Sequence, residues 1–552
     1  MRNLVMAIVA LLTLMACKQS PTADLIVTNA IIWTGDAARP EVQAMVIVND
    51  TIAAIGSNDE MEKWKGSNST IIDAKGQFIT PGFIDGHVHF ITGGMGLASV
   101  QLRDAKTPSE FIQRIKAFAA TVPAGTWIQG GDWDHENWGG QLPEASWIDS
   151  VTKDHPVFII RLDGHMGLAN SKAMQLAKLD ASTADVAGGT IVRRAGQQPS
   201  GIFKDNAMDL VFKAIPNPSA DMEDKALQAA MNYVASNGVT TVHNMGDYGG
   251  GKDIDIFQRN NQKNALITRA YVSMPLAQWS QLQTRVQQTG RGDKWVRIGV
   301  LKGFADGSLG SHTAAFFKPF TDAPKDSGFF VNSEDSLRAW IWQADKAGLQ
   351  CAIHAIGDKA INSILNIFEA AEKANGTRDR RFRIEHAQHI APTDIPRFAK
   401  LNVIPSMQPY HAIDDGSWAE KIIGSDRIKT TYAFRSLLEA NAALAFGSDW
   451  FVAPPTPLEG IYAAVTRRTL DDKNPNGWVP EQKITVEEAL RAYTTGAAFA
   501  GFMENDRGVL RPGMLADFVI LEKDIRNIEP AAIREVKVMK TVVGGKVVFE
   551  RK

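Results

Sequence analysis

Two histidines are spaced so that both could bind one metal ion. His87 and His89 stand at positions i and i+2 of the apolar segment 83–90. If this segment is a β-strand, the two imidazoles point to the same face. A histidine pair alone is a weak signal, because a histidine beside an apolar strand is more often a hydrogen-bonded structural residue. The pair needs further ligands before it indicates a metal site.

Four other apolar segments that we predict as strands end in a polar residue that could contribute to such a site. These residues are Lys302, His354, His386 and Asp449. In a parallel barrel the carboxyl ends of the strands meet at one rim, where barrel enzymes place their catalytic groups. Histidine and carboxylate ligands suit Zn²⁺ best, and also Mn²⁺, Fe²⁺ or Co²⁺. Together these residues predict a metal site at that rim.

The segments that carry these residues belong to a repeating strand–helix pattern, which predicts an α/β fold with a (β/α)₈ TIM barrel over residues 81–502. Near-continuous apolar runs are typical of strands buried in a parallel sheet. Eight such runs occur, at 83–90, 240–244, 267–273, 296–302, 350–354, 382–386, 403–408 and 443–449. The long segment between the first two runs, about 91–238, exceeds any ordinary loop, and we predict an insertion with structure of its own.

Two helix boundaries are readable within this pattern. An apolar face that includes Ile361 and Phe368 predicts a helix ending at Asn375, before a glycine. Thr485 followed by Glu488 predicts a capping box at the start of another helix.

Both ends of the chain contain short β-like runs separated by turn residues. Gly544-Gly545 predicts a hairpin turn in the C-terminal segment. We expect residues 24–80 and 503–552 to combine into one composite β-sandwich domain beside the barrel.

The N-terminus predicts export. Residues 1–16 contain a positive start and an apolar run too short to span a bilayer, as in a signal peptide. The run ends before Cys17 in a pattern resembling a bacterial lipobox, and residues 17–23 would form a tether. The prediction is a protein lipid-anchored through Cys17 to the periplasmic side of the cell envelope, at the outer membrane. The alternative is an ordinary signal peptide that contains a cysteine.

Composition restricts the partners. The formal net charge is −2, and the sequence contains no basic stripe, which argues against nucleic acid. We expect a small-molecule substrate, and a homo-oligomer is left open. With Cys17 acylated, the second cysteine, Cys351, has no partner for a disulfide.

The ligand set resembles that of the amidohydrolase superfamily, with ligands on strands one, four, five, six and eight. It resembles in particular amidohydrolase family 3, the branch of YtcJ-like and N-substituted formamide deformylase-like proteins. The resemblance spans about 24–548, and its supporting stretches are 81–87, 163–165, 302–311 and 511–517.

This resemblance implies a role for each ligand. His87, His89 and Asp449 would hold the more buried of two divalent metal ions. His354 and His386 would hold the second, and an N6-carboxylated Lys302 would bridge both. Asp449 would exchange a proton with a metal-bridging hydroxide and the leaving group.

The implied activity is hydrolysis of a non-peptide C–N bond, as in an N-acyl amine, a formamide, a cyclic amide or a carbamate. Ester or lactone hydrolysis on the same site is one alternative, because fold alone does not separate these reactions. A non-catalytic, ligand-binding surface lipoprotein is another.

Three further residues are candidates for substrate contact. His165 lies in a stretch characteristic of the branch, Trp133 lies in an aromatic and polar segment that could form a lid, and His312 follows a Gly-Ser-rich loop. For His165 and Trp133 a purely structural role is the alternative.

Overall fold

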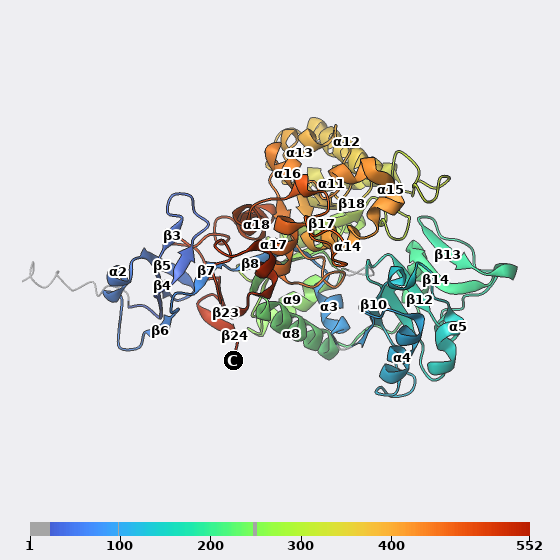
Figure 1. Cartoon of the computed structure of the whole chain (residues 1–552), viewed down its shortest axis with the longest axis horizontal. Coiled ribbons are helices and arrows are strands. Elements are labelled where there is room, and N and C mark those ends of the chain that lie inside the picture. The colour runs from blue at the N-terminus through green and yellow to red at the C-terminus, as the bar shows by residue number, and fades with distance from the viewer. Residues whose placement is uncertain (1–21, 98, 247–250) are drawn as a thin grey trace, which may run out of the picture.

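The computed structural model describes residues 22–97, 99–246 and 251–552. The predicted signal peptide, Cys17 and most of the tether lie outside these residues. Within the described ranges, no helix combines the length and apolar character that a membrane span requires. In Figure 1 the barrel occupies the middle of the molecule, with the N-terminal β-sheets on one side and the inserted segment on the other.

The predicted barrel is confirmed. Eight parallel strands form one sheet in the order β21-β20-β19-β18-β17-β16-β15-β8. Their bounds are β8 Phe83–Val88, β15 Val239–Asn244, β16 Arg269–Pro275, β17 Val296–Phe304, β18 Gln350–Ala355, β19 Arg383–His386, β20 Ile404–Met407 and β21 Ala445–Phe446. All eight correspond to predicted apolar runs. The first and last are shorter than predicted, so His89 and Asp449 follow their strands rather than lie within them.

Helices follow the strands, and most of them lie around the outside of the barrel (Figure 1), whereas α14 lies at the pocket. Their bounds are α3 Phe90–Gly96, α8 Ala220–Ser236, α9 Asp253–Gln262, α10 Trp279–Thr289, α11 Glu334–Lys346, α12 Asp358–Asn375, α13 Ile395–Lys400, α14 Pro409–Asp415, α15 Ala419–Arg427, α16 Phe434–Glu439, α17 Pro457–Thr466, α18 Val486–Arg491 and α19 Ala497–Ala500. Helix α12 ends at Asn375 as predicted, and its buried face includes Ile361 and Phe368. Thr485 and Glu488 form the predicted capping box of α18.

The segment between β8 and β15 contains its own six-stranded sheet, in the order β13-β14-β12-β11-β10-β9. The strands are β9 Val100–Gln101, β10 Gly130–Trp133, β11 Phe158–Arg161, β12 Met166–Ala169, β13 Gly189–Arg193 and β14 Pro199–Asp205. Its helices are α4 Pro108–Ala119, α5 Ala145–Ile148, α6 Ser171–Leu176 and α7 Asp209–Phe212. A separate apolar core lies on this sheet and includes Phe111, Trp133 and Leu168. The inserted sheet is therefore a folded unit rather than a long loop.

Two further sheets lie at the other end of the molecule. One has the order β5-β4-β1-β6, and the other, β24-β23-β22-β7-β2-β3, joins strands from both termini. Their bounds are β1 Leu25–Thr28, β2 Ile31–Trp33, β3 Glu41–Val42, β4 Ala44–Val48, β5 Thr51–Gly56, β6 Thr70–Asp73, β7 Phe78–Pro81, β22 Phe518–Leu521, β23 Val538–Val543 and β24 Lys546–Glu550, with the short helix α2 Asn58–Glu62 after β5. One apolar core holds residues of both sheets, such as Met45 and Phe518. Strand β7 leads almost directly into β8, so the shared sheet fixes the start of the barrel.

The first and last barrel strands meet at a seam rather than through a regular ladder. Asp449 N donates to His87 O at 2.7 Å, and His89 N donates to Trp450 O at 2.5 Å. The buried carboxylate of Asp85 crosses the same seam, accepting from Ser448 N at 2.8 Å and from Ser448 Oγ at 2.5 Å. Burial raises the pKa of Asp85 to about 7. The barrel thus closes at the residues predicted to bind metal.

Glycine is needed where the seam strands approach each other. A Cβ on Gly86 would lie 2.6 Å from Phe446 O, and one on Gly447 would lie 2.4 Å from His87 N. Real Cβ atoms do not approach backbone atoms so closely, so any side chain here would push the strands apart.

We therefore expect Gly86→Ala to lower the free energy of unfolding by about 1–3 kcal/mol, as overpacking typically does. Gly96→Ala is the control, because its Cβ would meet nothing within 4 Å. Chemical denaturation of both variants measures the effect. Equal stability of the two variants would show that the seam tolerates a wider spacing.

Candidate metal centre

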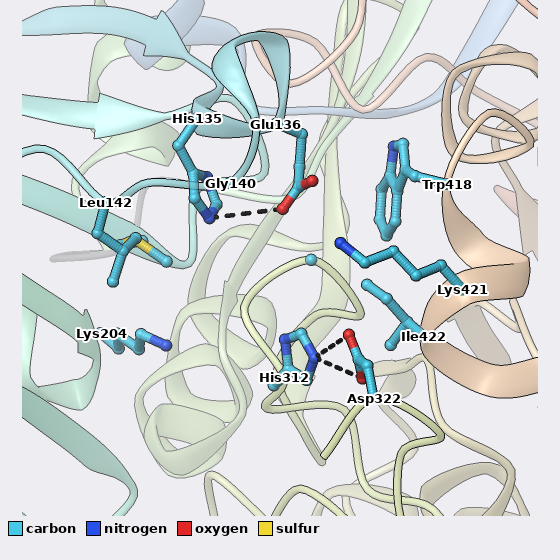
Figure 2. Close-up of a pocket in the computed structure, with 13 residues that line it drawn as sticks. His135, Glu136, Gly140, Leu142, Lys204, His312, Asp322, Trp418, Lys421 and Ile422 are labelled. Carbon is cyan, nitrogen blue, oxygen red and sulfur yellow. Dashed lines mark hydrogen bonds and ion pairs between the residues drawn. The ribbon is translucent and has the colours of Figure 1, made fainter.

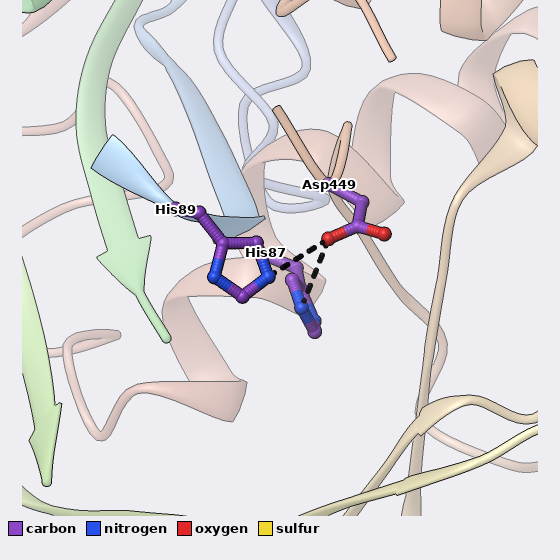
Figure 3. A group of neighbouring side chains, drawn as sticks. All are labelled: His87, His89 and Asp449. Carbon is purple, nitrogen blue, oxygen red and sulfur yellow. Dashed lines mark ion pairs between the residues drawn. The ribbon is translucent and has the colours of Figure 1, made fainter. Parts of the chain in front are cut away.

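Three predicted ligands converge at the seam. The ligand atoms of His87, His89 and Asp449 all lie within 4.8 Å of one another, and all three side chains are buried. Asp449 Oδ1 lies 3.3 Å from His87 Nε2 and 3.2 Å from His89 Nε2. Figure 3 shows both imidazoles turned toward this carboxylate. Two imidazoles and a carboxylate are a ligand set that suits a divalent transition metal.

The orientation of His87 is set by a buried chain of charged groups. Glu385 Oε2 lies 2.5 Å from His87 Nδ1, so a proton on Nδ1 leaves Nε2 free to act as a ligand. Arg383 donates to both oxygens of Glu385, at 2.7 and 3.1 Å. Burial, reinforced by the Lys302 ammonium, lowers the pKa of His87 to about 4. The imidazole is therefore neutral at pH 7, as a metal ligand must be.

His89 is held by backbone. Its Nδ1 lies 2.5 Å from Gly246 O, which leaves Nε2 directed at Asp449. His89 is also the N-cap of α3, directly after β8. The change from strand to helix therefore falls at the second histidine of the pair.

Lys302 joins the same group from β17, which continues for two residues beyond it rather than ending at it as predicted. Its Nζ lies 3.1 Å from His87 Nε2, and the residue is only 4% exposed. Among the described residues, no carboxylate lies within ion-pair distance of Nζ. Burial lowers the pKa of Lys302 to about 8, so part of the amine is neutral near physiological pH.

A second group contains one predicted ligand and one residue that sequence reasoning missed. Ligand atoms of His386, His411 and Asp449 lie within 4.8 Å of one another. His411 lies on α14, and its ring stacks parallel to that of His386 at 6.4 Å between centroids. The sequence interpretation assigns His411 a structural role, but its place just beyond the seventh predicted strand puts it at the catalytic rim. That position is the signal that identifies it.

His354 lies beside this second group but is not a member of it. Its ring centroid is 4.5 Å from that of His386, and its Nε2 lies 2.9 Å from Gly307 O. Four of the six predicted ligands, His87, His89, His386 and Asp449, therefore belong to the two groups. Lys302 contacts the first group through His87. The structure places the sixth, His354, against His386.

The candidate substrate residues lie in three different environments. His165 lines the pocket in front of the ligands, with its ring 5.0 Å from that of His354 and its Nδ1 2.7 Å from Asp205 Oδ1. His312 lines a separate, outer cavity and pairs with Asp322 (Figure 2).

Trp133 does not have the position that substrate contact requires. Its side chain is fully buried in the core of the inserted sheet, and its Nε1 donates to Ile159 O at 2.9 Å. The substrate prediction for Trp133 is therefore corrected to core packing, because the indole fills the sheet interior and has its hydrogen bond satisfied there.

The pocket fits a metal centre. It is a narrow cavity of about 50 Å³, lined by His354, His386, His411 and Asp449 on one side and by residues of the inserted sheet on the other. His386 Nδ1 and His411 Nε2 are buried and make no hydrogen bond among the described residues. Buried polar atoms are rarely left unsatisfied without a functional reason. Each of these two ring nitrogens could bind a metal ion through its lone pair or form a hydrogen bond with a substrate.

Comparisons with known proteins identify the family of this chain. An amidohydrolase family model matches residues 70–549. The protein LONG AFTER FAR-RED 3 of Arabidopsis thaliana is 41% identical over 96% of this chain and 92% of its own length. The putative amidohydrolase YtcJ of Bacillus subtilis is 31% identical over 95% of this chain and 99% of its own length.

The chain is also similar to a characterised enzyme and to a solved crystal structure. The N-substituted formamide deformylase of Arthrobacter pascens is 27% identical over 96% of this chain and 98% of its own length. The crystal structure of an uncharacterized metal-dependent hydrolase from Pyrococcus horikoshii superimposes with a TM-score of 0.74 at 27% identity, covering 92% of this chain and 99% of that one. The chain therefore belongs to amidohydrolase family 3, a family of metal-dependent amidohydrolases built on this barrel.

Proposed function

We propose that the protein hydrolyses a non-peptide C–N bond in a small molecule, such as an N-acyl amine, a formamide, a cyclic amide or a carbamate. The observation that carries the proposal is the position of Asp449, which faces His87 and His89 with one carboxylate oxygen at the floor of the pocket. The likeness to an N-substituted formamide deformylase supports it.

In this proposal the histidines of the site bind metal ions, and Asp449 both binds metal and transfers a proton. His87, His89 and Asp449 would hold one divalent ion, and His386, with His354 or His411, a second. When bound, such ions lower the pKa of a shared water and so supply the nucleophile near neutral pH. Asp449 Oδ2 lies 4.0 Å from His411 Nε2 on the pocket side. This oxygen is placed to accept a proton and return it to a leaving amine.

Protonation of the leaving group by Asp449 would favour amide substrates over ester substrates. An amine is a poor leaving group until its nitrogen is protonated, whereas an alkoxide departs with less help. A site with a buried carboxylate at the reacting centre is therefore best matched to C–N cleavage. Ester and lactone substrates remain the second candidate, because the attack on the carbonyl is the same.

We expect Asp449→Asn to lower turnover of N-acyl amines by at least about 10²-fold, the usual contribution of a positioned general acid–base. The control is Asp426→Asn, since Asp426 is exposed and pairs with Lys429 on the surface. Steady-state kinetics on matched amides and lactones, with metal content measured in parallel, checks this. Undiminished turnover in Asp449→Asn would refute the assigned role, and activity confined to the lactones would favour the second candidate.

We further propose that Lys302 is carboxylated on Nζ and bridges two metal ions. Only a neutral amine reacts with CO₂, and burial favours the neutral form of Lys302 by lowering its pKa to about 8. A carbamate would replace a buried cation with an anion between the two ligand groups.

Elemental analysis should then find about two metal ions per chain, most often Zn²⁺. Protein loaded with ¹³C-bicarbonate should show a carbamate carbon resonance that is lost in Lys302→Ala together with bound metal. Lys225→Ala, on the exposed face of α8, should retain both. Full metal content in Lys302→Ala would contradict the bridging role.

The N-terminal sequence supports a proposal about location. We propose that the protein is exported and lipid-anchored through Cys17, where two or more acyl chains would give stable membrane attachment.

In a bacterial host, Cys17→Ala should move the protein from the membrane fraction to the soluble fraction. Cys351→Ala is the matched control, because Cys351 is the second of the two cysteines and is buried in the barrel. Detergent-phase partitioning measures both variants. A membrane-bound Cys17→Ala protein would show that acylation is not the anchor.

A further inference from the structure

One carboxyl group in the wall of the metal pocket is not among the candidate metal ligands. Asp415 is the last residue of α14, one helical turn after His411, and it lines the pocket. Residues four apart on a helix share a face, with about 6 Å between them along the axis. His411 Nε2 lies 4.0 Å from Asp449 Oδ2. Asp415 therefore lies about one helical turn from the proposed reacting centre.

One oxygen of the Asp415 carboxyl group is held by two donors. Tyr432 Oη donates to Asp415 Oδ2 at 2.5 Å, and burial raises the pKa of Tyr432 well above its usual value, so the phenol keeps its proton. Gln388 Nε2 donates to the same oxygen at 2.7 Å, and both partners are buried. Among the described residues, none forms a hydrogen bond with Oδ1. Because Asp415 lines the pocket, Oδ1 is the oxygen available to a substrate.

A chain of hydrogen bonds determines that the Gln388 amide group is a donor to Asp415. Thr431 Oγ1 donates to Arg427 O at 3.1 Å, so it accepts from His389 Nδ1, which lies 2.8 Å away. Burial lowers the pKa of His389 to about 3, so the ring is neutral and its Nε2 has no proton. This nitrogen accepts from Gln388 Nε2 at 3.1 Å. The NH₂ group of Gln388 is therefore the part that faces Asp415, and Oδ2 accepts from both partners.

The surroundings of Asp415 favour its neutral form. Among the described residues, no cation lies within ion-pair distance of its carboxyl group, and the C-terminal end of a helix is unfavourable for an anion. Burial raises the pKa of Asp415 to about 8, although the hydrogen bond from Tyr432 acts in the opposite direction. Asp414 and Asp134 also oppose ionisation, whereas Arg161 favours it but is already paired with two other carboxylates. Since Oδ2 accepts two hydrogen bonds, the acid proton belongs on Oδ1.

We propose that Asp415 binds the substrate as a neutral carboxylic acid, with its Oδ1–H donating to an uncharged oxygen. The substrates would be amides that carry a second oxygen, such as a keto or another amide carbonyl, a few bonds from the scissile carbonyl. An anionic group is less well matched, because three further carboxylates, Asp134, Asp163 and Asp414, line the same pocket. This inference rests on the proposed C–N hydrolysis and adds a specificity-determining residue with the substrate group that it recognises.

Infrared difference spectroscopy of the full-length, metal-loaded protein against its Asp415→Asn variant tests the protonation state without any substrate. A raised pKa keeps the acid form below it, so we expect the C=O stretch of a protonated carboxyl group at neutral pH. This band should give way to carboxylate bands as the pH rises through about 8. Carboxylate bands alone at neutral pH would overturn the inference, whatever the outcome for C–N hydrolysis.

Steady-state kinetics tests the hydrogen bond to the substrate. One series is N-acyl amines with a keto oxygen at successive positions of the acyl chain, and the other has a methylene group in its place. We expect kcat/KM to be about 3–10-fold higher for the best keto amide than for its methylene counterpart, as one neutral hydrogen bond typically gives. Asp415→Asn should keep this preference, because its NH₂ group donates in place of the acid O–H. Asp415→Ala should lose it through a higher KM, with kcat unchanged.

Asp426→Ala is the control for these kinetics, because Asp426 is exposed and pairs with Lys429 on the surface. Circular dichroism and metal content, measured in parallel, show whether each variant is folded and loaded. A preference that survives in Asp415→Ala would overturn the inference. So would an Asp415→Asn variant that loses the preference as completely as Asp415→Ala, because the carboxylate form would then be the one that binds. Either result leaves C–N hydrolysis intact.

A binding measurement separates the two proposals if neither series is hydrolysed. Calorimetric titration with the keto amides should then show binding that Asp415→Ala weakens and Asp415→Asn retains. Such a result would support the role of Asp415 and count against C–N hydrolysis of these compounds. Equal binding of both series, or no binding of either, would overturn the role of Asp415.

Discussion

The arrangement of the whole centre depends on how the barrel closes. The first and last strands are joined at backbone hydrogen bonds made by His87, His89 and Asp449 themselves, rather than by a ladder extending along both strands. The buried Asp85 carboxylate accepts two hydrogen bonds from Ser448 across this seam. Gly86 and Gly447 allow the two strands to approach closely enough for these bonds to form. Any change in the spacing of the seam would directly change the separation of His87, His89 and Asp449, the candidate metal ligands. The hydrogen bonds that close the barrel therefore also fix the positions of the candidate metal ligands.

A second requirement is electrostatic. The centre gathers several titratable side chains in a space from which water is largely excluded, where an unpaired charge is costly. Burial alone would raise the pKa of Glu385, but Arg383 and His87 hold it well below its usual range. Arg383 also donates to Gly86 O at 2.6 Å and to Ser406 Oγ at 2.9 Å. One guanidinium thus connects the orientation of His87 to the seam and to a third strand.

The inserted sheet supplies the opposite wall of the pocket. Asp163 accepts from Ser308 Oγ at 2.5 Å and from Ser311 Oγ at 3.1 Å, and pairs with Arg161 at 2.7 Å. Hydrogen bonds therefore join two stretches that are far apart in sequence, 163–165 and 302–311, at the pocket. Because the insertion also contributes Lys204 to the outer cavity, the part of the chain that distinguishes this barrel from a minimal one also shapes the space available to substrate.

The sequence by itself determined the barrel and most of the ligand set. Buried parallel strands leave near-continuous apolar runs, and chemistry at the rim leaves a polar residue at the end of each run, so His87, Lys302, His386 and Asp449 were all identifiable from local pattern. A rule that selects only the residues at strand ends passes over His411, because this residue lies in the helix after the seventh strand, and its position just beyond that strand is the one local signal for it. Local pattern also could not distinguish Trp133 in a core from Trp418 at a cavity, since both are aromatic residues in polar surroundings. Contacts between the insertion and the barrel join residues more than a hundred positions apart. Only the tertiary structure decides which side chains share such a space, because that depends on packing between elements and not on the order of residues along any one of them.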